Sequence, residues 1–358
     1  MSYRGHRPDT MPHVFQTFAT RSACGLLLAL AACGGATGDG GAGAEPVQAF
    51  TGPTMGSTYE VKFVGSMPIA RVRPVVEAEL AAVDLAFSQW REDSEIARLN
   101  RHASTAPFPA SERFCGVLRQ ALDVAVATEG AFDPTVKPLS DLYRRAKRDP
   151  QHHLDPAATA AARELVDFHR IAVRDGAVVK QRPDVQVDLD GIVAGAAADA
   201  IAARLEAIGV TSFYLEITGE VLCRGEKAPG DPWRVGVVDP EYDASGGDVA
   251  IRTLPLRGAV CTSGDYRNGF VDDGRFVHHV FDPRTGGNAP HHVVSVSVLA
   301  DRCALADALG TALLVLGDER TRPLWPALEL FGARGALFLL PGGEGALRQV
   351  EFAWPRAE

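Results

Sequence analysis

The sequence has no excess of basic residues, few cysteines and no apolar run near its N-terminus long enough to cross a membrane. The formal net charge is −9, and no basic segment with interleaved aromatics occurs, which argues against a protein that coats nucleic acid. The apolar segment at residues 23–32 is too short for a membrane-spanning helix. Beyond it lie four scattered cysteines, Cys115, Cys223, Cys261 and Cys303. Without Cys-x-x-Cys or metal spacing, they are compatible with disulfides or with buried free thiols.

Several common functional motifs are absent. The sequence contains no Gly-x-Gly-x-x-Gly after a strand, no Walker-type phosphate loop and no Gly-x-Ser-x-Gly. No zinc spacing surrounds His278, His279, His291 or His292. What remains is an ordinary globular composition, with 46% apolar and 23% charged residues over 358 positions, enough for one large domain or two ordinary ones.

Residues 1–33 are predicted to form a signal peptide. Arg21 precedes the short apolar segment, and Leu30-Ala31-Ala32-Cys33 has the pattern of a bacterial lipobox. In such a signal the cysteine, here Cys33, is acylated and becomes the first residue of the mature chain. A plain signal peptide that happens to contain Cys33 is the alternative.

The next segment, residues 34–49, is rich in Gly and Ala and predicts a flexible tether. Residues 50–358 then form the globular domain. Together these segments predict a protein that is exported and lipid-anchored to a bacterial membrane, facing the periplasm or the cell exterior.

The globular part predicts an α+β fold with a largely antiparallel sheet, packed helices and a cleft between two lobes. Short turns separate most of the strands, which favours antiparallel pairing. Apolar periodicity predicts helices over residues 74–90, 112–128, 156–168, 192–208 and 303–316, and Asp93 or Ser94 caps a short helix through Asn100. Strands are predicted over residues 59–64, 185–191, 212–217, 221–224, 233–238, 249–255, 259–262, 293–299, 336–340 and 349–352, with a hairpin over 171–179.

The segment 277–286 is the first candidate for a functional site. A β-prone run ends abruptly in Asp-Pro-Arg-Thr-Gly, so a strand delivers His278 and His279 into a tight polar turn. Because side chains alternate along a strand, the two histidines point to opposite faces. The alternative is an ordinary hairpin with one buried and one solvated histidine.

A second candidate is the start of the alanine-rich helix. The predicted strand 185–191 stops at the acidic pair Asp188 and Asp190, and small residues fill positions 194–198. Amide groups at such a helix start attract phosphate. Close packing against the sheet needs the same small residues and is the competing interpretation.

A third candidate is the apolar helix that begins at Cys303. Asp307 and Thr311 are four residues apart and share one side of it. Carboxylate and hydroxyl oxygens suit a hard cation such as magnesium. The alternative is an ion pair between Asp307 and a nearby arginine.

Taken together, these stretches resemble the ApbE family of FAD:protein FMN transferases, from about Phe50 to the C-terminal end. The motifs follow the order of the family. They are residues 55–59 (MGSTY), 94–100 (SEIARLN), 130–139 (GAFDPTVKPL), 188–192 (DLDGI), 233–240 (WRVGVVDP), 262–266 (TSGDY), 277–286 (VHHVFDPRTG) and 306–311 (ADALGT).

The resemblance implies an activity and a set of residues. Such enzymes split FAD, release AMP and join the FMN phosphate to a Thr or Ser hydroxyl of a partner protein, for which a membrane redox-complex subunit is expected. By resemblance, His279 lies beside the reacting phosphate, and the Gly191 carbonyl, Asp307 and Thr311 hold Mg²⁺. The FAD site is then lined by Met55, Trp90, Ala131, Phe132, Asp133, Asp188, Ala194 and Val280.

Two departures from the family pattern leave the function open. Ala194 stands where the family usually has lysine, and Thr218-Gly219-Glu220 stands where it has Gly-Gly-Asp. Three hypotheses follow: a lipid-anchored flavin transferase, a FAD pyrophosphatase that yields FMN and AMP, and a non-catalytic FAD-binding lipoprotein.

Overall fold

The structure is a computed structural model that describes residues 45–238, 240, 250–264, 269–289, 292–343 and 346–356. The predicted signal peptide, Cys33 and most of the predicted tether lie outside these residues, as do Asp265 and Tyr266 of the 262–266 motif. Within the described ranges, no helix combines the length and apolar character needed to cross a bilayer.

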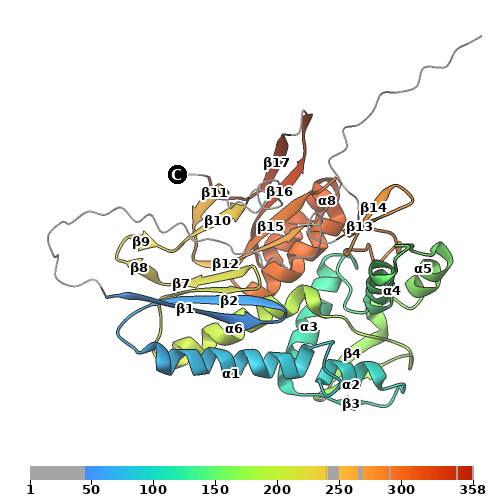
Figure 1. Cartoon of the computed structure of the whole chain (residues 1–358), viewed down its shortest axis with the longest axis horizontal. Helices are drawn as coiled ribbons and strands as arrows, with labels where there is room; N and C mark the ends of the chain where they lie inside the picture. The colour runs from blue at the N-terminus through green and yellow to red at the C-terminus, as the bar shows by residue number, and fades with distance from the viewer. Residues whose placement is uncertain are drawn as a thin grey trace, which may run out of the picture.

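An antiparallel eight-stranded sheet forms the frame of the molecule (Figure 1). Its order is β1-β2-β6-β7-β12-β15-β16-β17, and every neighbouring pair is antiparallel. The strands are β1 (Val47–Thr54), β2 (Ser57–Val64), β6 (Phe213–Ile217), β7 (Glu220–Arg224), β12 (Gly258–Gly264), β15 (Ser295–Ala300), β16 (Ala333–Pro341) and β17 (Leu347–Phe352). The predicted antiparallel α+β fold is thus confirmed. Strand β1 begins at Val47 and pairs with β2, so the sheet includes the last three residues of the predicted tether, 47–49.

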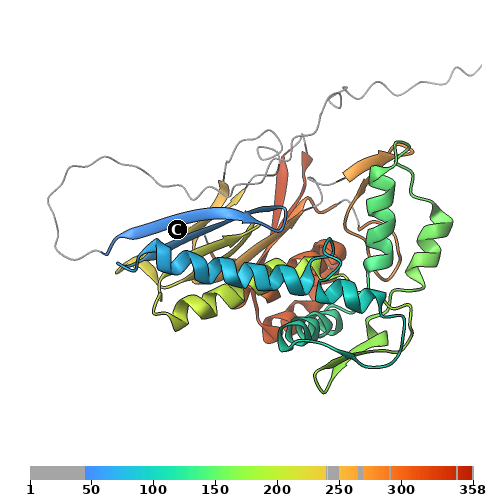
Figure 2. The same cartoon turned by 60° about the horizontal axis from the view of Figure 1, so that its bottom comes forward.

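Helices cover one face of this sheet in two layers (Figure 2). Helices α6 (Asp190–Ala207), α8 (Cys303–Phe331) and α1 (Ile69–Phe87) contact the strands, while α3 (Glu112–Ala127) packs against α6 and α8. On the other side of the sheet, a second apolar cluster joins Trp233 and Leu254 to Tyr214 and Val221. The flanking hairpin there consists of β10 (Arg234–Val238) and β11 (Ala250–Pro255).

A smaller lobe lies beside the helices (Figures 1 and 2). It contains α4 (Lys137–Arg148), α5 (Pro156–Arg163) and the hairpin of β13 (Gly269–Asp272) and β14 (Arg275–His278). Its own apolar cluster includes Leu139, Tyr143, Phe270 and Phe281. The remaining elements are α2 (Glu95–Arg101), the three-stranded sheet of β3 (Phe108–Pro109), β5 (Ala177–Lys180) and β4 (Ile171–Arg174), the turn η1 (Phe168–Arg170) and the pair β8 (Glu226–Ala228) and β9 (Asp231–Pro232).

Several predicted elements differ from those observed. Residues 185–189 are not a strand. The Asn100 side chain takes the place of a neighbouring strand, because it accepts a hydrogen bond from the backbone N–H of Val187 at 2.7 Å and donates one to its carbonyl at 2.8 Å. Helix α8 continues past the predicted end at residue 316, across a break at Gly317 with φ 72°. Helix α5 ends at Arg163 rather than Phe168, and α4 was not predicted at all. The Ser94 cap and the hairpin over 171–179 are confirmed.

The small residues of α6 allow α6 and α8 to approach closely. A Cβ atom at Gly195 would lie 2.4 Å from the carbonyl oxygen of Cys303, so only glycine fits there. Close packing is therefore one role of these small residues, and at Gly195 the partner is α8.

We expect Gly195→Ala to lower the free energy of unfolding by about 1–3 kcal/mol, because a backbone atom cannot rotate away from the new methyl group. Urea unfolding measures this change. Gly116→Ala on α3 is the matched control, since nothing lies within 4 Å of its Cβ position and alanine favours a helix. An unchanged stability in the Gly195 variant would show that the two helices can separate without cost.

Candidate active site

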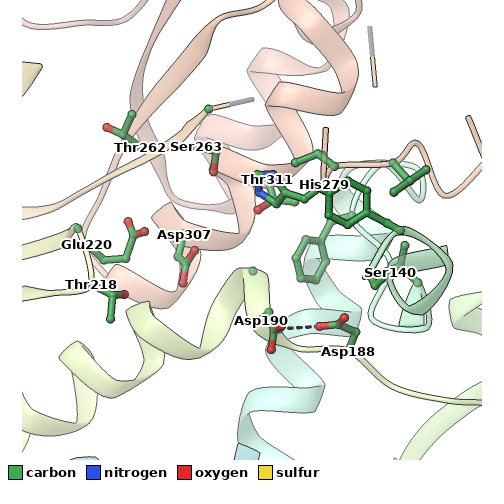
Figure 3. A pocket seen from close by; sticks show the side chains of 18 of the residues that line it. Ser140, Asp188, Asp190, Thr218, Glu220, Thr262, Ser263, His279, Asp307 and Thr311 are labelled. Atoms are coloured by element: carbon green, nitrogen blue, oxygen red, sulfur yellow. Dashed lines mark hydrogen bonds between the residues drawn. The ribbon is translucent and has the colours of Figure 1, made fainter. Parts of the chain in front are cut away.

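A cavity of about 920 Å³ lies where α4, the starts of α6 and β7, and α8 meet (Figure 3). This volume is at the upper end of the range for small-molecule sites. Ten of the twelve residues that sequence analysis assigned to a site line its wall. They are Trp90, Ala131, Phe132, Asp133, Asp188, Gly191, His279, Val280, Asp307 and Thr311.

The cavity wall does not include the other two, Met55 and Ala194. Met55 lies in the turn between β1 and β2 with φ 47°, and is 39% exposed. Ala194 has only a methyl group on α6, where the family pattern has a long lysine side chain. That Met55 and Ala194 contact FAD therefore stays a prediction.

Asp307 is a buried carboxylate on α8. Its Oδ2 atom accepts a 2.9 Å hydrogen bond from the N–H of Gly195, which a regular helix would direct to the Gly191 carbonyl. Burial raises the pKa of Asp307 to about 7, and this bond opposes the rise. The predicted alternative of an arginine partner is wrong within the described residues, because no positively charged group acts on this carboxyl.

Gly191 lies against Thr311. A Cβ atom at Gly191 would lie 2.9 Å from Thr311 Oγ1 and 3.3 Å from the Phe132 ring. The backbone of Gly191 also departs from helical geometry, with φ −84° and ψ 18°. The fold thus brings together the three groups predicted to hold a cation, from two helices far apart in the sequence.

These groups fit magnesium. A carboxylate, a hydroxyl and a backbone carbonyl are oxygen ligands, and Mg²⁺ in phosphate chemistry keeps waters and substrate oxygens in its other positions. In the described part of the chain, no three His, Cys, Asp or Glu side chains form a complete protein cage for a metal. An Mg²⁺ ion that also binds water and phosphate oxygens needs only a few ligands from the protein.

Arg144 connects the small lobe to the start of α6. Its Nη2 atom lies 3.3 Å from Asp188 Oδ2 and 2.8 Å from Asp190 Oδ2, and its side chain lines the cavity. Asp188 Oδ1 in turn accepts from the backbone N–H of Asp190, shown as a dashed line in Figure 3. Sequence analysis missed Arg144 because it did not identify α4, although the buried residues Leu139, Tyr143 and Ala146 recur there at helical spacing.

Asp133 maintains the shape of its own loop. Its Oδ1 accepts from the backbone N–H and the hydroxyl of Thr135 at 2.7 and 2.6 Å, and its Oδ2 accepts from Phe168 N–H at 3.0 Å. Burial raises the pKa of Asp133, while these bonds oppose the rise. The carboxylate thus fixes the loop that presents Ala131 and Phe132 to the cavity.

The two histidines lie on opposite sides of the chain, as predicted. His278 is buried, with Nε2 3.1 Å from the carbonyl of Ala289, whereas His279 is exposed and reaches the cavity (Figure 3). The Asn288 amide donates to the carbonyls on either side of His279, those of His278 at 2.7 Å and Val280 at 2.9 Å. The backbone that carries His279 is therefore fixed independently of its imidazole.

The segment after these histidines is a turn, as expected. The Asp282 carboxylate accepts from Arg284 N–H at 3.0 Å and from its Nε at 2.7 Å. The Asp282 carbonyl accepts from Gly286 N–H. These contacts fix the turn that follows the strand, and the Asp282 carboxylate is bonded to Arg284 within that turn.

Comparison with known proteins agrees with this arrangement. The ApbE family model matches residues 55–330, so the chain belongs to the ApbE family. It is 35% identical over 278 residues to the FAD:protein FMN transferase of Vibrio cholerae, covering 76% of this chain and 82% of that protein. The enzyme of the same name from Salmonella typhimurium is also 35% identical, over 282 residues, with 77% and 80% covered.

Solved structures show the same fold. The flavinyl transferase ApbE of Pseudomonas stutzeri superposes with a TM-score of 0.75 at 33% identity, covering 86% of this chain and 95% of that one. The flavin transferase ApbE of Vibrio cholerae gives 0.75 at 29% identity, with 86% and 97% covered. Both the predicted family and the predicted fold class are confirmed.

Proposed function

We propose that this protein transfers the FMN moiety of FAD to a Thr or Ser hydroxyl of a partner protein, with release of AMP and with Mg²⁺ as cofactor. Relatives that carry the name FAD:protein FMN transferase are 35% identical over most of both chains. The observation that carries the proposal is the buried Asp307 beside Thr311 and Gly191, in a cavity of about 920 Å³.

Each group has a role in this reaction. The hydroxyl oxygen of the acceptor forms a bond to the FMN phosphorus, the bond from that phosphorus to the AMP phosphate oxygen breaks, and the hydroxyl proton passes to a base. His279 is the group we assign as that base, because it is exposed at the cavity wall. Asp307, Thr311 and the Gly191 carbonyl would hold Mg²⁺, which supplies charge neutralisation at the pyrophosphate.

The remaining wall residues would bind FAD. Trp90, Ala131, Phe132 and Val280 offer apolar surface to a flavin or adenine ring. Asp188, through its contacts with Arg144 and Asp190, maintains the start of α6 near the phosphates.

The location is part of the same proposal. The lipobox at Cys33 and the Gly- and Ala-rich segment after it support a lipid-anchored enzyme outside the cytoplasm, with a membrane redox-complex subunit as acceptor. A Cys33→Ser variant that still incorporated labelled fatty acid would contradict the anchor.

One assay separates transfer from the alternatives. The mature chain is incubated with FAD, Mg²⁺ and a threonine-containing acceptor peptide, and a peptide with valine at that position is the control. We expect covalent flavin fluorescence on the threonine peptide alone. Free FMN and AMP without labelling would instead support a FAD pyrophosphatase, and intact FAD would support a binding protein.

A further inference from the structure

A second carboxylate faces the cation site from the sheet. Glu220 begins β7, directly after the turn Thr218-Gly219, and its side chain enters the cavity opposite Asp307 (Figure 3). Its Oε2 atom is buried and has no hydrogen-bond partner among the described residues. A buried carboxylate oxygen without a partner is costly, so it points to a ligand that the protein atoms do not supply.

Among the residues that the structure describes, no lysine or arginine balances the charge of Glu220. The Cys261 thiol and the backbone N–H of Thr262 both act to lower the pKa of this carboxyl. Burial raises the pKa of Glu220 well above its usual value, and the negative charges of Asp307 and Glu216 add to the rise. Two carboxylates that face one another across a buried space need either protons or a cation between them.

We propose that Glu220 is a second carboxylate of the divalent-cation site, so that the cation held by Asp307 also takes the free Oε2 of Glu220 as a ligand. The inference rests on the proposed cation site but not on the transfer reaction. Two carboxylates match the two charges of the ion, and hard oxygen ligands suit Mg²⁺ and Mn²⁺. Glutamate has one methylene more than the aspartate of the family pattern, which extends its reach into the cavity.

The proposal has a consequence that does not depend on activity. With two carboxylates at the site, the protein binds a divalent cation before FAD arrives. Titration of the FAD-free protein with Mn²⁺, followed by electron paramagnetic resonance of the free ion, therefore tests the site directly.

Glu220→Gln should weaken Mn²⁺ binding about tenfold or more, since it removes the charge and keeps the size. Its melting temperature without metal should equal or exceed that of the wild type, because the variant no longer buries an unbalanced carboxylate. The rise in melting temperature on adding Mn²⁺ should be largely lost.

Glu216→Gln is the matched control. Glu216 is also buried, on the neighbouring strand β6, with a pKa raised to about 7 by burial. It accepts from Gly219 N–H and is not part of the cavity wall. This variant should keep wild-type Mn²⁺ affinity.

Equal Mn²⁺ affinity in Glu220→Gln and the wild type would overturn the proposal, as would absence of Mn²⁺ binding in both. A lower melting temperature with unchanged Mn²⁺ binding would assign Glu220 a structural role instead. If the glutamine variant does not fold, Glu220→Asp keeps the charge, shortens the reach and should also bind Mn²⁺ more weakly. Wild-type protein that binds Mn²⁺ but leaves FAD intact would contradict the proposed function while leaving the role of Glu220 standing.

Discussion

Asp307→Asn should abolish cation binding and flavin transfer together, with kcat/KM falling by about 10²–10³-fold or more. Asparagine keeps the size of the side chain, and its oxygen can still accept the hydrogen bond from Gly195 N–H. The fold should therefore survive while the charge that attracts the cation is lost. Mn²⁺ titration and the acceptor-labelling assay measure the two effects in the same preparation.

The pH dependence of the wild type gives an independent test of this role. Because burial raises the pKa of Asp307 to about 7, a proton competes with the cation at and below neutral pH. Mn²⁺ affinity should fall as the pH is lowered from about 8 to about 6. The stability of the metal-free protein should depend on pH in the opposite direction. Below pH 7 Asp307 holds a proton in the folded state that it has lost in the unfolded state, so the free energy of unfolding falls as the pH rises through 7. The pH dependence of stability should weaken in Asp307→Asn, which lacks the titrating carboxyl group.

Asp199 provides the control for a buried acid without a cation role. Its two carboxylate oxygens accept from the N–H groups of Cys303 and Ala304, at 2.8 and 3.0 Å, and so cap the start of α8. Asp199→Asn should lose stability yet keep Mn²⁺ affinity. An equal loss of Mn²⁺ binding in Asp199→Asn and Asp307→Asn would mean that Asp307 affects cation binding only by positioning α8.

Local sequence patterns were sufficient for much of the fold and for two residues of the proposed cation site. Asp307 and Thr311 could be identified because their spacing places them on one side of a helix that is otherwise apolar. Side-chain alternation predicted that the two histidines face opposite sides of the strand, and the family resemblance predicted that His279 is the one beside the phosphate. In each case the relevant geometry is contained within a few consecutive residues.

Tertiary contacts decided the features that sequence analysis missed. Residues 185–189 alternate like a strand, but Asn100, 87 positions away, satisfies the backbone of Val187. Arg144 reaches the site from α4, and its contacts with Asp188 and Asp190 join residues 44 and 46 positions apart. Sequence analysis recorded Glu220 only as a departure from the family pattern. Its unpartnered oxygen could not be predicted, because it results from the packing of β7 against α8.

His279→Ala should keep FAD binding but slow transfer to the acceptor by about 10²–10³-fold, within the range for loss of a general base. The variant should fold normally, because His279 is exposed and the Asn288 amide bonds to the carbonyls of His278 and Val280 on either side of it. Single-turnover labelling with saturating FAD measures the slower step, and FAD fluorescence measures binding. His278→Ala is the control and should mainly lower stability, because that ring is buried against the Ala289 carbonyl.

The pH profile distinguishes a base from a residue that only shapes the cavity. Wild-type transfer at saturating Mg²⁺ should rise with pH through the range in which histidines titrate, and this rise should be absent from the residual activity of His279→Ala. A purely steric role would lower the rate at every pH and leave the shape of the profile unchanged. Turnover equal to that of the wild type would remove His279 from the mechanism and return the proton-accepting role to another group on the cavity wall.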